Sequence, residues 1–439
     1  MEEENSLIEQ RRANLAALRE KGIEPFANKF TPDETCAGAR EKYEEGREVA
    51  LAGRMMAFRT MGKSVFLDIR DGSDRMQVYA QKNALGDEAF EVLKKLDLGD
   101  FIGVKGTMFT TRTEEITLKM AEFTVVGKAL RPLPAKWHGL SNIETRYRQR
   151  YLDLIANDDV KQVFYKRSAI IREIRDFMHE RGFIEVETPT MQAIPGGAAA
   201  QPFVTRHNAL GCEFYLRIAL ELYLKRLLVG GMDRVFEIGR NYRNEGISPR
   251  HNPEFTMMEL YVAYKDYDWM MGFVEEIVEA VAIELHGSTE LQVGENTISF
   301  KRPWKRIPLL EAIEEKTGHD LSGKSRDEMA AIAAKLNIEV DDSMGCGKII
   351  DELFGEFVEA SLIQPTFITD YPVELSPLAK RHRSKEGLVE RFEAICNGKE
   401  LCNAFSELND PDDQRARFEE QVVLGLGGDE EAMQLDEDY

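Results

Sequence analysis

The residues best suited to chemistry lie between positions 243 and 259, within two predicted strands and the loop that joins them. They are Arg243, Glu245, His251, Phe255 and Glu259. The planar guanidinium of Arg243 suits a phosphate, because it can donate two parallel hydrogen bonds. Glu245 offers an acceptor and Phe255 an aromatic face, which together suit a purine. The run therefore predicts a site that binds ATP.

This run reads RNEG at 243–246 and HNPEFTMMELY at 251–261. It resembles motif 2 of the class II aminoacyl-tRNA synthetases, and its wording is similar to that of the lysyl-tRNA synthetases. The resemblance implies that Arg243 clamps the α-phosphate of ATP and the carboxylate of the amino acid. It also implies that His251 approaches the terminal phosphates. Phe255 would stack on adenine, and Glu245 would accept the amino hydrogens of the base.

Strand geometry groups the side chains of this region further. Alternate residues of a strand face the same side, which in 254–264 groups Phe255, Met257, Glu259 and Tyr261. By the same parity, we expect Arg243 and Glu245 to share a face of the preceding strand. Polar groups beside Phe and Met indicate either a hydrogen-bonded core network or the floor of a ligand site.

A small-residue loop at 194–200 and the segment 216–225 are also similar to the family. Gly197 lies in this loop, where glycine lets a ligand approach the backbone. The resemblance implies that Glu221 holds the α-amino group of the substrate. The family generally has proline where this chain has Leu220, and losing the fixed φ of proline could loosen Glu221.

The segments 365–372 and 400–410 resemble the catalytic sheet of the lysyl enzymes. The resemblance implies that Glu400 and Glu407 bind the Mg²⁺ that bridges the ATP phosphates, and that Asn403 and Phe405 line the amino-acid pocket. Positions 400 and 407 have opposite parity in an unbroken strand. A bulge or a strand end near Cys402 is therefore needed. The alternative is that both glutamates are exposed strand carboxylates.

The charge of the pocket predicts which amino acid is activated. An aspartyl enzyme needs cations around the substrate side chain, whereas the residues here are acidic or hydrogen-bonding. They are Glu221, Glu259, Tyr261, Asn403 and Glu407. Such a pocket suits an ammonium at each end of L-lysine, and unpaired carboxylates would disfavour neutral competitors.

Residues 48–126 follow a strand pattern with one short helix, in the order of three strands, a helix and two strands. This is the order of an OB barrel, a fold that stacks nucleic-acid bases on aromatic side chains. Arg59, Phe66 and Gln77 lie on consecutive predicted strands. Phe66 alone is more simply a half-buried barrel residue, but the spacing resembles the anticodon-reading face of the aspartyl, asparaginyl and lysyl subgroup.

The predicted fold class is α+β, with an OB barrel followed by the antiparallel-sheet catalytic domain of class II synthetases. We expect an N-terminal helical extension at 1–45, with a helix from Ser6 to Lys21 that Gly22 ends. The barrel occupies 46–130, a hinge 131–158 and the catalytic domain 159–439. A helix from about 159 to Arg181, followed by a strand and Thr188-Pro189, resembles motif 1, which implies a homodimer.

Composition limits the remaining possibilities. A net charge of −21 argues against indiscriminate nucleic-acid binding but does not exclude RNA. The resemblance implies that tRNA(Lys), and not DNA, is the partner. No segment approaches the roughly 20 apolar residues that span a bilayer, and the N-terminus lacks a secretion signal. The five cysteines contain no Cys-x-x-Cys pair. These features predict a cytoplasmic enzyme with reduced thiols and no membrane partner.

The resemblance covers nearly all of residues 7–439. In the family, a helix and motif 3 follow the position of Tyr439, and the glycine run at 425–428 does not supply that motif. We expect the chain as given to be inactive or nearly so, because losing one such charge contact costs about 10²–10³ in rate. The alternatives are a non-catalytic RNA-binding protein on this scaffold, a ligase that lysylates a protein, and an asparaginyl or aspartyl ligase.

Overall fold

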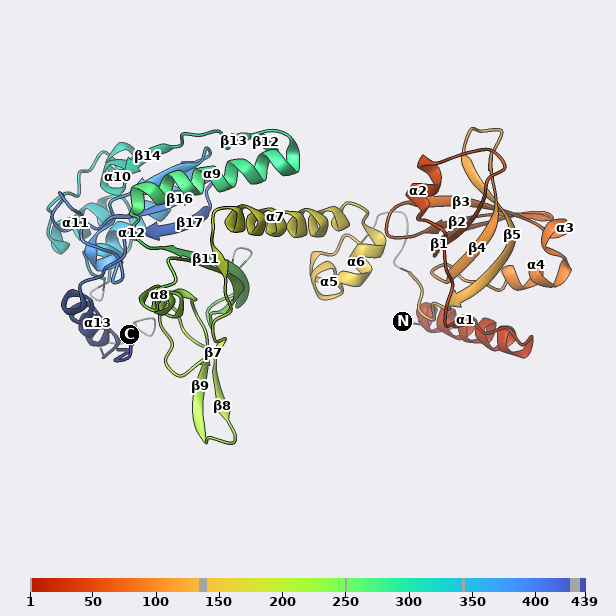
Figure 1. Ribbon diagram of the computed structural model, residues 1–439, viewed down its shortest axis with the longest axis horizontal. Helices are drawn as coiled ribbons and strands as arrows, with labels where there is room; N and C mark the ends of the chain where they lie inside the picture. The colour runs from red at the N-terminus through yellow and green to blue at the C-terminus, as the bar shows by residue number, and fades with distance from the viewer. Residues whose placement is uncertain (1, 134–139, 249–250, 342–343, 427–434) are drawn as a thin grey trace. The chain divides into compact units, whose positions relative to one another are not determined.

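The computed structural model describes residues 2–133, 140–248, 251–341, 344–426 and 435–439 (Figure 1). Part of the predicted hinge, residues 134–139, and part of the glycine run at 425–428 lie outside these ranges. The chain divides into two compact units, Met1–Phe164 and Tyr165–Tyr439. Each unit has apolar cores of its own. Among the described residues, no helix has both the length and the apolar character needed to cross a bilayer.

The first unit is built on a closed barrel with the strand order β1-β2-β3-β5-β4. The strands are β1 Glu48–Met61, β2 Ser64–Arg70, β3 Arg75–Gln81, β4 Phe101–Thr110 and β5 Ile116–Gly127. The short helices α3 Lys82–Leu85 and α4 Asp87–Leu93 join β3 to β4. The predicted OB barrel is thus confirmed, with three strands, a short helical segment and two strands in the predicted order.

Side-chain alternation explains why these strands close around a core. Val65, Leu67 and Ile69 are fully buried in β2, while Phe66 between them is only partly buried. This period of two places one face of each strand in the barrel and the other outside. Gly106 marks a shift in the β4–β5 register, and a Cβ there would lie 1.9 Å from the Lys119 carbonyl oxygen.

The predicted N-terminal helix is confirmed as α1 Glu2–Glu20, and Gly22 follows it with φ +70°. Leu15 and Leu18 are buried against the first unit. Arg11 is only 8% exposed and donates to the Ala129 carbonyl at 2.7 Å. Part of the basic face of this helix therefore holds the fold together.

The remaining helices of the first unit lie before and after the barrel in the chain. They are α2 Cys36–Glu41, between α1 and β1, and then α5 Ile143–Arg148 and α6 Arg150–Ala156. The predicted motif 1 helix is α7 Val160–Glu180, and Gly182 after it has φ +77°. Its C-terminal half packs through Phe177 and Met178 into a core of the second unit.

Two sheets of the second unit carry the predicted site. One has the order β11-β10-β6, from β6 Ile184–Glu185, β10 Arg234–Tyr242 and β11 Glu254–Val262. The other has the order β14-β15-β16-β17, from β14 Lys305–Pro308, β15 Thr366–Thr369, β16 Arg391–Ile395 and β17 Glu400–Phe405. The predicted α+β class, with largely antiparallel pairing, is confirmed.

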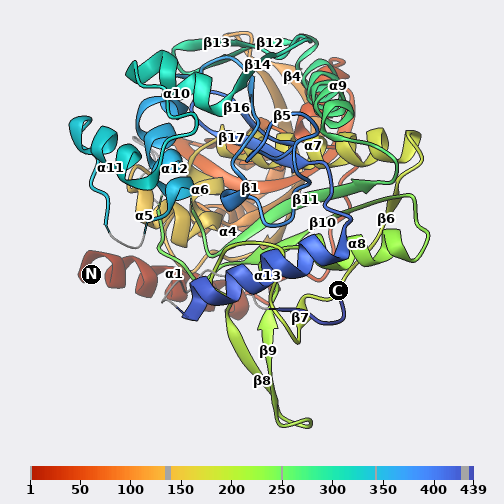
Figure 2. The same ribbon diagram turned by 90° about the vertical axis from the view of Figure 1, so that its left-hand side faces the viewer.

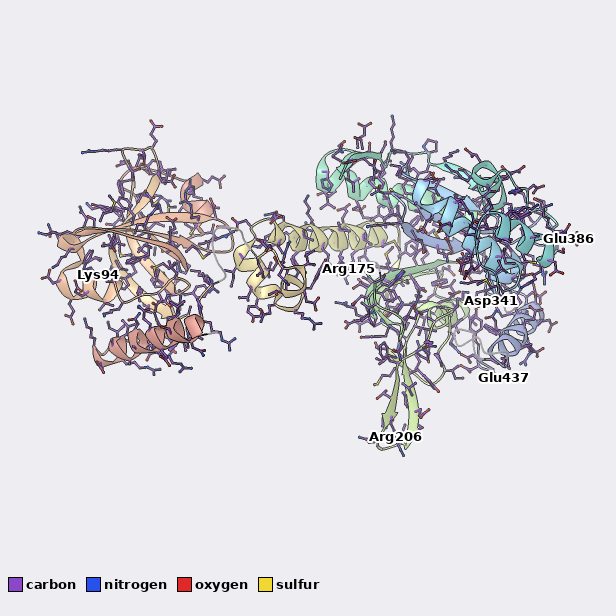
Figure 3. The ribbon with its side chains drawn as sticks, turned by 180° about the vertical axis from the view of Figure 1, so that it is seen from behind. Lys94, Arg175, Arg206, Asp341, Glu386 and Glu437 are labelled. Carbon is purple, nitrogen blue, oxygen red and sulfur yellow. The ribbon has the colours of Figure 1, made fainter. Side chains whose placement is uncertain are left out.

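A further sheet of the second unit has the order β7-β9-β8, from β7 Met191–Gln192, β8 Val204–His207 and β9 Cys212–Leu216. Figure 2 shows β8 and β9 projecting from this unit as a long hairpin. Arg206 is labelled near the end of that hairpin in Figure 3. The chain then returns from β9 into α8 Glu221–Val229, which carries part of the site.

Helices surround these sheets. They include α9 Tyr267–His286, α10 Leu309–Thr317, α11 Arg326–Lys335, α12 Cys346–Phe357 and α13 Pro411–Leu426, and the hairpin β12 Glu290–Val293 with β13 Asn296–Ser299 follows α9. An aromatic cluster fixes α7 and α9 near β10. Phe273 of α9 lies 5.5 Å from both Phe177 and Phe183, measured between ring centroids. Fully buried Phe236 of β10 belongs to the same cluster.

Candidate active site

The floor of the site is strand β11, where Glu259 and Tyr261 face the same side as predicted. The Tyr261 hydroxyl donates to Glu259 Oε2 at 3.0 Å. The backbone N–H of Leu220 donates to the other oxygen, Oε1, at 3.2 Å. Burial raises the pKa of Glu259 to about 7, and the negative charge of Glu221 adds to this effect. The carboxylate is thus fixed at both oxygens in a site that disfavours its charge.

Leu220 is the position where the family generally has proline. It is fully buried, with φ −91° and ψ −20°, and immediately precedes α8. A proline would have no N–H to donate. The departure at this position therefore gives Glu259 a hydrogen bond that a proline could not make, and the following residue, Glu221, stays buried at the start of α8.

The small-residue loop meets α8 at this point. Gly197 is buried with φ +89°, a left-handed conformation that side chains rarely adopt. A Cβ at Gly197 would lie 3.1 Å from the Cβ atoms of Ala219 and Glu221. Glycine therefore lets the loop pack closely against the start of the helix, whereas the approach of a ligand to this backbone stays a prediction.

A lysine that the sequence analysis gave no role lies among the carboxylates. Lys225 Nζ donates to Glu221 Oε1 at 2.5 Å and lies 2.6 Å from Glu407 Oε2. It also lies 5.2 Å from the centroid of the Phe405 ring. The spacing could have revealed it, because residues four apart on a helix share a face and Lys225 follows Glu221 by four.

Glu407 lies partly buried in the same pocket. Desolvation raises its pKa to about 7, and the neighbouring Lys225 ammonium acts in the opposite direction. Burial and nearby carboxylates, Glu221 first, also hold the pKa of Tyr261 well above its usual value. The pocket therefore collects negative charge that water screens only partly, so a bound cation would be stabilised there.

Strand β17 contains the irregularity that is needed if Glu400 and Glu407 are to face the same side. The β16–β17 register shifts between Ala394 and Ile395, which skips Leu401, and the strand ends at Phe405. The predicted bulge or strand end is thus confirmed. Asn403 faces the same side as Phe405, and its Oδ1 accepts from Arg391 Nε at 3.1 Å.

Glu400 has different surroundings from Glu407. Burial raises its pKa to about 7, with a further contribution from Glu393, while Arg391 and Arg243 lower it. Arg391 in turn donates to Glu393 at 2.6 Å. Among the residues the structure describes, no group of three or more His, Cys, Asp or Glu is arranged to hold a metal ion. A metal ion here would need oxygen atoms of a bound molecule in addition to those of Glu400.

The predicted nucleotide residues are only partly brought together. The Arg243 guanidinium lies 5.2 Å from the centroid of the Phe255 ring. Glu245 and His251 are exposed, and His251 Nδ1 lies 2.9 Å from Ser248 Oγ. The prediction that Arg243 and Glu245 share a strand face is wrong, because β10 ends at Tyr242 and both residues lie in the loop beyond it.

A buried ion pair on the same face of the sheet as Glu259 supports this arrangement. Arg217 donates to Glu237 at 2.7 Å, and both side chains are almost completely buried. Glu237 also accepts from the backbone and hydroxyl of Thr188, at 3.0 Å and 2.7 Å. Glycine is required at position 239, because a Cβ there would lie 2.2 Å from the Arg217 guanidinium. Glu237 pairs directly with Glu259 in the β10–β11 register.

The predicted anticodon residues lie on one sheet surface of the barrel. Arg59 pairs with Phe66 across β1 and β2, and Gln77 of β3 donates to Thr117 Oγ1 at 2.8 Å. The sequence analysis missed Tyr79, whose ring centroid lies 4.7 Å from that of Phe66. Its position two residues after Gln77 on the same strand was the available signal.

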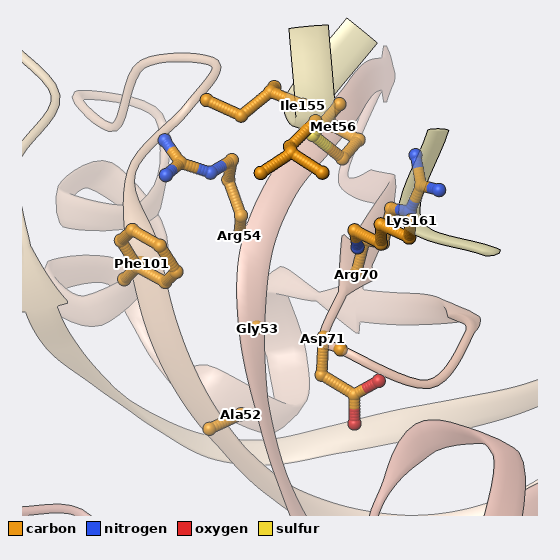
Figure 4. Close-up of a pocket in the computed structure, with 11 residues that line it drawn as sticks. Ala52, Gly53, Arg54, Met56, Arg70, Asp71, Phe101, Ile155 and Lys161 are labelled. Atoms are coloured by element: carbon orange, nitrogen blue, oxygen red, sulfur yellow. The ribbon is translucent and has the colours of Figure 1, made fainter. Parts of the chain in front are cut away.

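The first unit also contains a cavity of about 460 Å³, away from these residues (Figure 4). Arg54 and Phe101 of the barrel line it, together with Ile155 of α6 and Lys161. None of the predicted site residues is among those that line this cavity.

Comparison with known proteins agrees with this architecture. Residues 142–439 match the model of the family described as tRNA synthetases class II (D, K and N), and residues 49–126 match that of the OB-fold nucleic acid binding domain. Fold and site thus define a class II synthetase catalytic domain with an OB barrel before it.

Individual relatives show which members of this class the chain is similar to. The chain is 52% identical to a lysine–tRNA ligase of Pelotomaculum thermopropionicum, over 100% of this chain and 88% of that protein. It is 51% identical to one of Carboxydothermus hydrogenoformans and 52% identical to one of Moorella thermoacetica, each over 100% of this chain and 90% of the relative. The chain therefore belongs to the lysine–tRNA ligase family of class II tRNA synthetases.

Proposed function

We propose that this protein activates L-lysine with ATP to lysyl-adenylate and transfers the lysyl group to the 3′ end of tRNA(Lys). The observation that carries the proposal is the charge of the pocket. Glu221, Glu259 and Glu407 bring three carboxylates, and Lys225 supplies one ammonium. When the carboxylates are ionised, two negative charges remain, which equals the number of ammonium groups that lysine brings.

The chemistry of activation needs positioning more than a strong base. The lysine carboxylate is already ionised at neutral pH and attacks the α-phosphorus of ATP in line, and pyrophosphate leaves. Arg243 would neutralise charge on the α-phosphate and the attacking carboxylate, while Phe255 would stack on adenine. Glu245 and His251 would reach the nucleotide from the loop, so they are assigned to ATP rather than to lysine.

Mg²⁺ is the cofactor that this reaction implies. When bound, it would neutralise charge on the ATP phosphates. Glu400 fits this role, because Mg²⁺ favours one or two carboxylates together with phosphate oxygens and Glu400 feels the charge of Arg243. Glu407 fits the amino-acid pocket more closely, because the Lys225 ammonium already lies at one of its oxygens.

We assign the anticodon of tRNA(Lys) to the barrel surface. Phe66 and Tyr79 offer adjacent aromatic faces, and bases stack on such faces in OB folds. Arg59 offers donors beside them, and Gln77 offers both a donor and an acceptor. The family match of this barrel to nucleic acid binding domains supports the assignment. The cytoplasm, where tRNA is charged, is the compartment that this function requires.

We further propose a homodimer formed through α7. Tyr165 and Ile170 of this helix are 56% and 38% exposed, and Ile184 of β6 is 52% exposed. Exposed apolar side chains of this kind suit a contact between identical surfaces of two copies.

Lysine-dependent exchange of pyrophosphate into ATP tests the proposed activity. The measurement is made on a protein of the relatives' full length, and we expect exchange with lysine and none with aspartate or asparagine. Arg243→Ala should reduce it by about 10²–10³, because the lost interaction is with developing phosphate charge. Arg240→Ala is the matched control, since Arg240 is an exposed β10 arginine paired with Glu254.

Each outcome of the exchange experiment separates the candidate functions. A protein that binds tRNA(Lys) but shows no lysine-dependent exchange would be an RNA-binding protein on this scaffold. Exchange with lysine but no charging of tRNA would favour a ligase that lysylates a protein. The barrel favours tRNA as the acceptor, because it matches nucleic acid binding domains.

A further inference from the structure

Lys225 occupies the centre of the acidic pocket without being part of the proposed catalysis. Its side chain is only 8% exposed, and those of Glu221 and Glu407 are 10% and 35% exposed. The nitrogen contacts one oxygen of each carboxylate, so these two oxygens are at most about 5.1 Å apart, the two contact distances taken together. Glu221 belongs to α8, whereas Glu407 lies beyond the end of β17.

Two carboxylates this close would repel each other without the ammonium between them. Burial strengthens that repulsion, because little water remains to screen it. The face of the Phe405 ring, 5.2 Å away, gives the ammonium a further favourable contact. Lys225 is thus the cation that links the helix side of the pocket to the sheet side.

We propose that Lys225 is a positioning residue for lysine binding, a permanent counter-ion that fixes Glu221 and Glu407 so that both can accept from the ammonium groups of the substrate. The inference rests on the proposed function, namely that this pocket binds lysine. Each carboxylate uses one oxygen for Lys225 and keeps a second oxygen for the substrate. Lys225 therefore helps to set the affinity for lysine without touching it.

A competing role would be that of a plug, in which Lys225 holds the place of the substrate ammonium and must leave when lysine binds. The burial of the Lys225 ammonium argues against this competing role. Withdrawing the ammonium would leave it without partners in a closed region of α8, and an unpaired buried charge is costly. The helix also fixes the stem, because Glu221 and Lys225 belong to the same turn.

Substitution of the ammonium distinguishes these roles. Lys225→Met keeps the length and removes the charge, and we expect it to weaken lysine binding about tenfold or more by calorimetry. ATP binding should change by less than about twofold, because Lys225 lies in the amino-acid pocket. If the Met variant fails to fold, the same binding measurement is made on Lys225→Gln, which lacks the charge but can still donate to a carboxylate.

The neighbouring residue provides a matched control. Arg226 lies on the same helix and pairs with Asp436 at 2.7 Å, but it contacts none of the three pocket carboxylates in the described structure. Arg226→Met should leave lysine affinity within about twofold. If both variants weakened lysine binding equally, loss of helix stability would explain the result and the proposal would be overturned.

Chemical rescue by a small cation would not be expected if Lys225 had only a packing role. Lys225→Ala leaves space for a small cation, so n-propylammonium should restore much of the lysine affinity, whereas n-propanol should not. Unchanged lysine affinity in Lys225→Met would contradict the proposal, and tighter binding would establish the plug. Failure of the unsubstituted protein to bind lysine would instead remove the proposed function.

Discussion

The proposed anticodon face of the barrel and the proposed lysine pocket of the second unit would recognise their ligands by different physical means. The barrel face depends on Phe66 and Tyr79, partly buried rings whose strands are anchored by fully buried neighbours such as Leu67 and Val78. The pocket instead depends on buried charges, of which Lys225 and Glu407 come from distant parts of the chain. Stacking needs only a well-formed strand, whereas buried charge needs counter-ions that the whole fold must supply.

Among the substitutions, Glu259→Gln is expected to produce the largest difference between lysine affinity and tRNA affinity. Losing one buried carboxylate should weaken lysine binding about 10-fold to 100-fold, the usual range for a hydrogen bond to a charged group. Affinity for tRNA(Lys) should stay within about twofold. Parallel titrations with lysine, ATP and tRNA measure this. An equal loss of ATP affinity would show that Glu259 acts through the nucleotide or its metal.

The reciprocal change is Phe66→Ala. A base stacked on an aromatic ring contributes about 1–3 kcal/mol, so affinity for tRNA(Lys) should fall roughly tenfold or more. Lysine affinity should not change, which filter binding and calorimetry can establish together. Phe109→Ala is a useful control, because this ring lies 6.0 Å from Tyr79 but outside the predicted anticodon set. Unchanged tRNA affinity in Phe66→Ala would remove the barrel face from recognition.

Acidity should affect the pocket and not the barrel face. The pKa values of Glu259 and Glu407 are raised to about 7, so both take up protons in the empty pocket as the pH falls below 7. Lysine must then displace protons, and its dissociation constant should rise by up to about tenfold per pH unit for each group. Above pH 7 the constant should level off. A flat profile between pH 5 and 8 would contradict the account.

The smallest expected effect is at Leu220. Leu220→Pro removes the N–H that donates to Glu259, and we expect lysine affinity to fall by about 2-fold to 10-fold. That hydrogen bond lowers the pKa of Glu259, so its loss should also move the pH dependence upward. Leu220→Met keeps both the N–H and the volume and serves as the control. Equal behaviour of the two variants would show that the N–H contributes nothing.

The same contrast explains how far the sequence could predict the structure. The order of strands in the barrel was predicted correctly, because alternation and turn residues act within a few positions. The bulge near Cys402 followed from strand parity, once the resemblance had implied that Glu400 and Glu407 act together. Local rules of this kind need no knowledge of distant contacts.

The parts that the sequence could not predict depend on long-range pairing. The Lys225–Glu407 contact joins residues that no local pattern connects, and the end of β10 at Tyr242 placed Arg243 and Glu245 in a loop instead of on a strand. The helical spacing from Glu221 to Lys225 was visible in the sequence. The role of Lys225 could not be predicted from this spacing, because only the packing of the sheet brings Glu407 next to Lys225.

The most direct measurement of the central claim compares L-lysine with L-norleucine in equilibrium binding to the unmodified protein. The two amino acids share a backbone and an unbranched side chain of similar length, but norleucine lacks the terminal ammonium. If two ammonium groups complete the charge of the pocket, norleucine should bind about 100-fold more weakly or not at all, because a buried carboxylate would be left without its partner. Comparable affinities would contradict the account and show that the carboxylates serve another purpose.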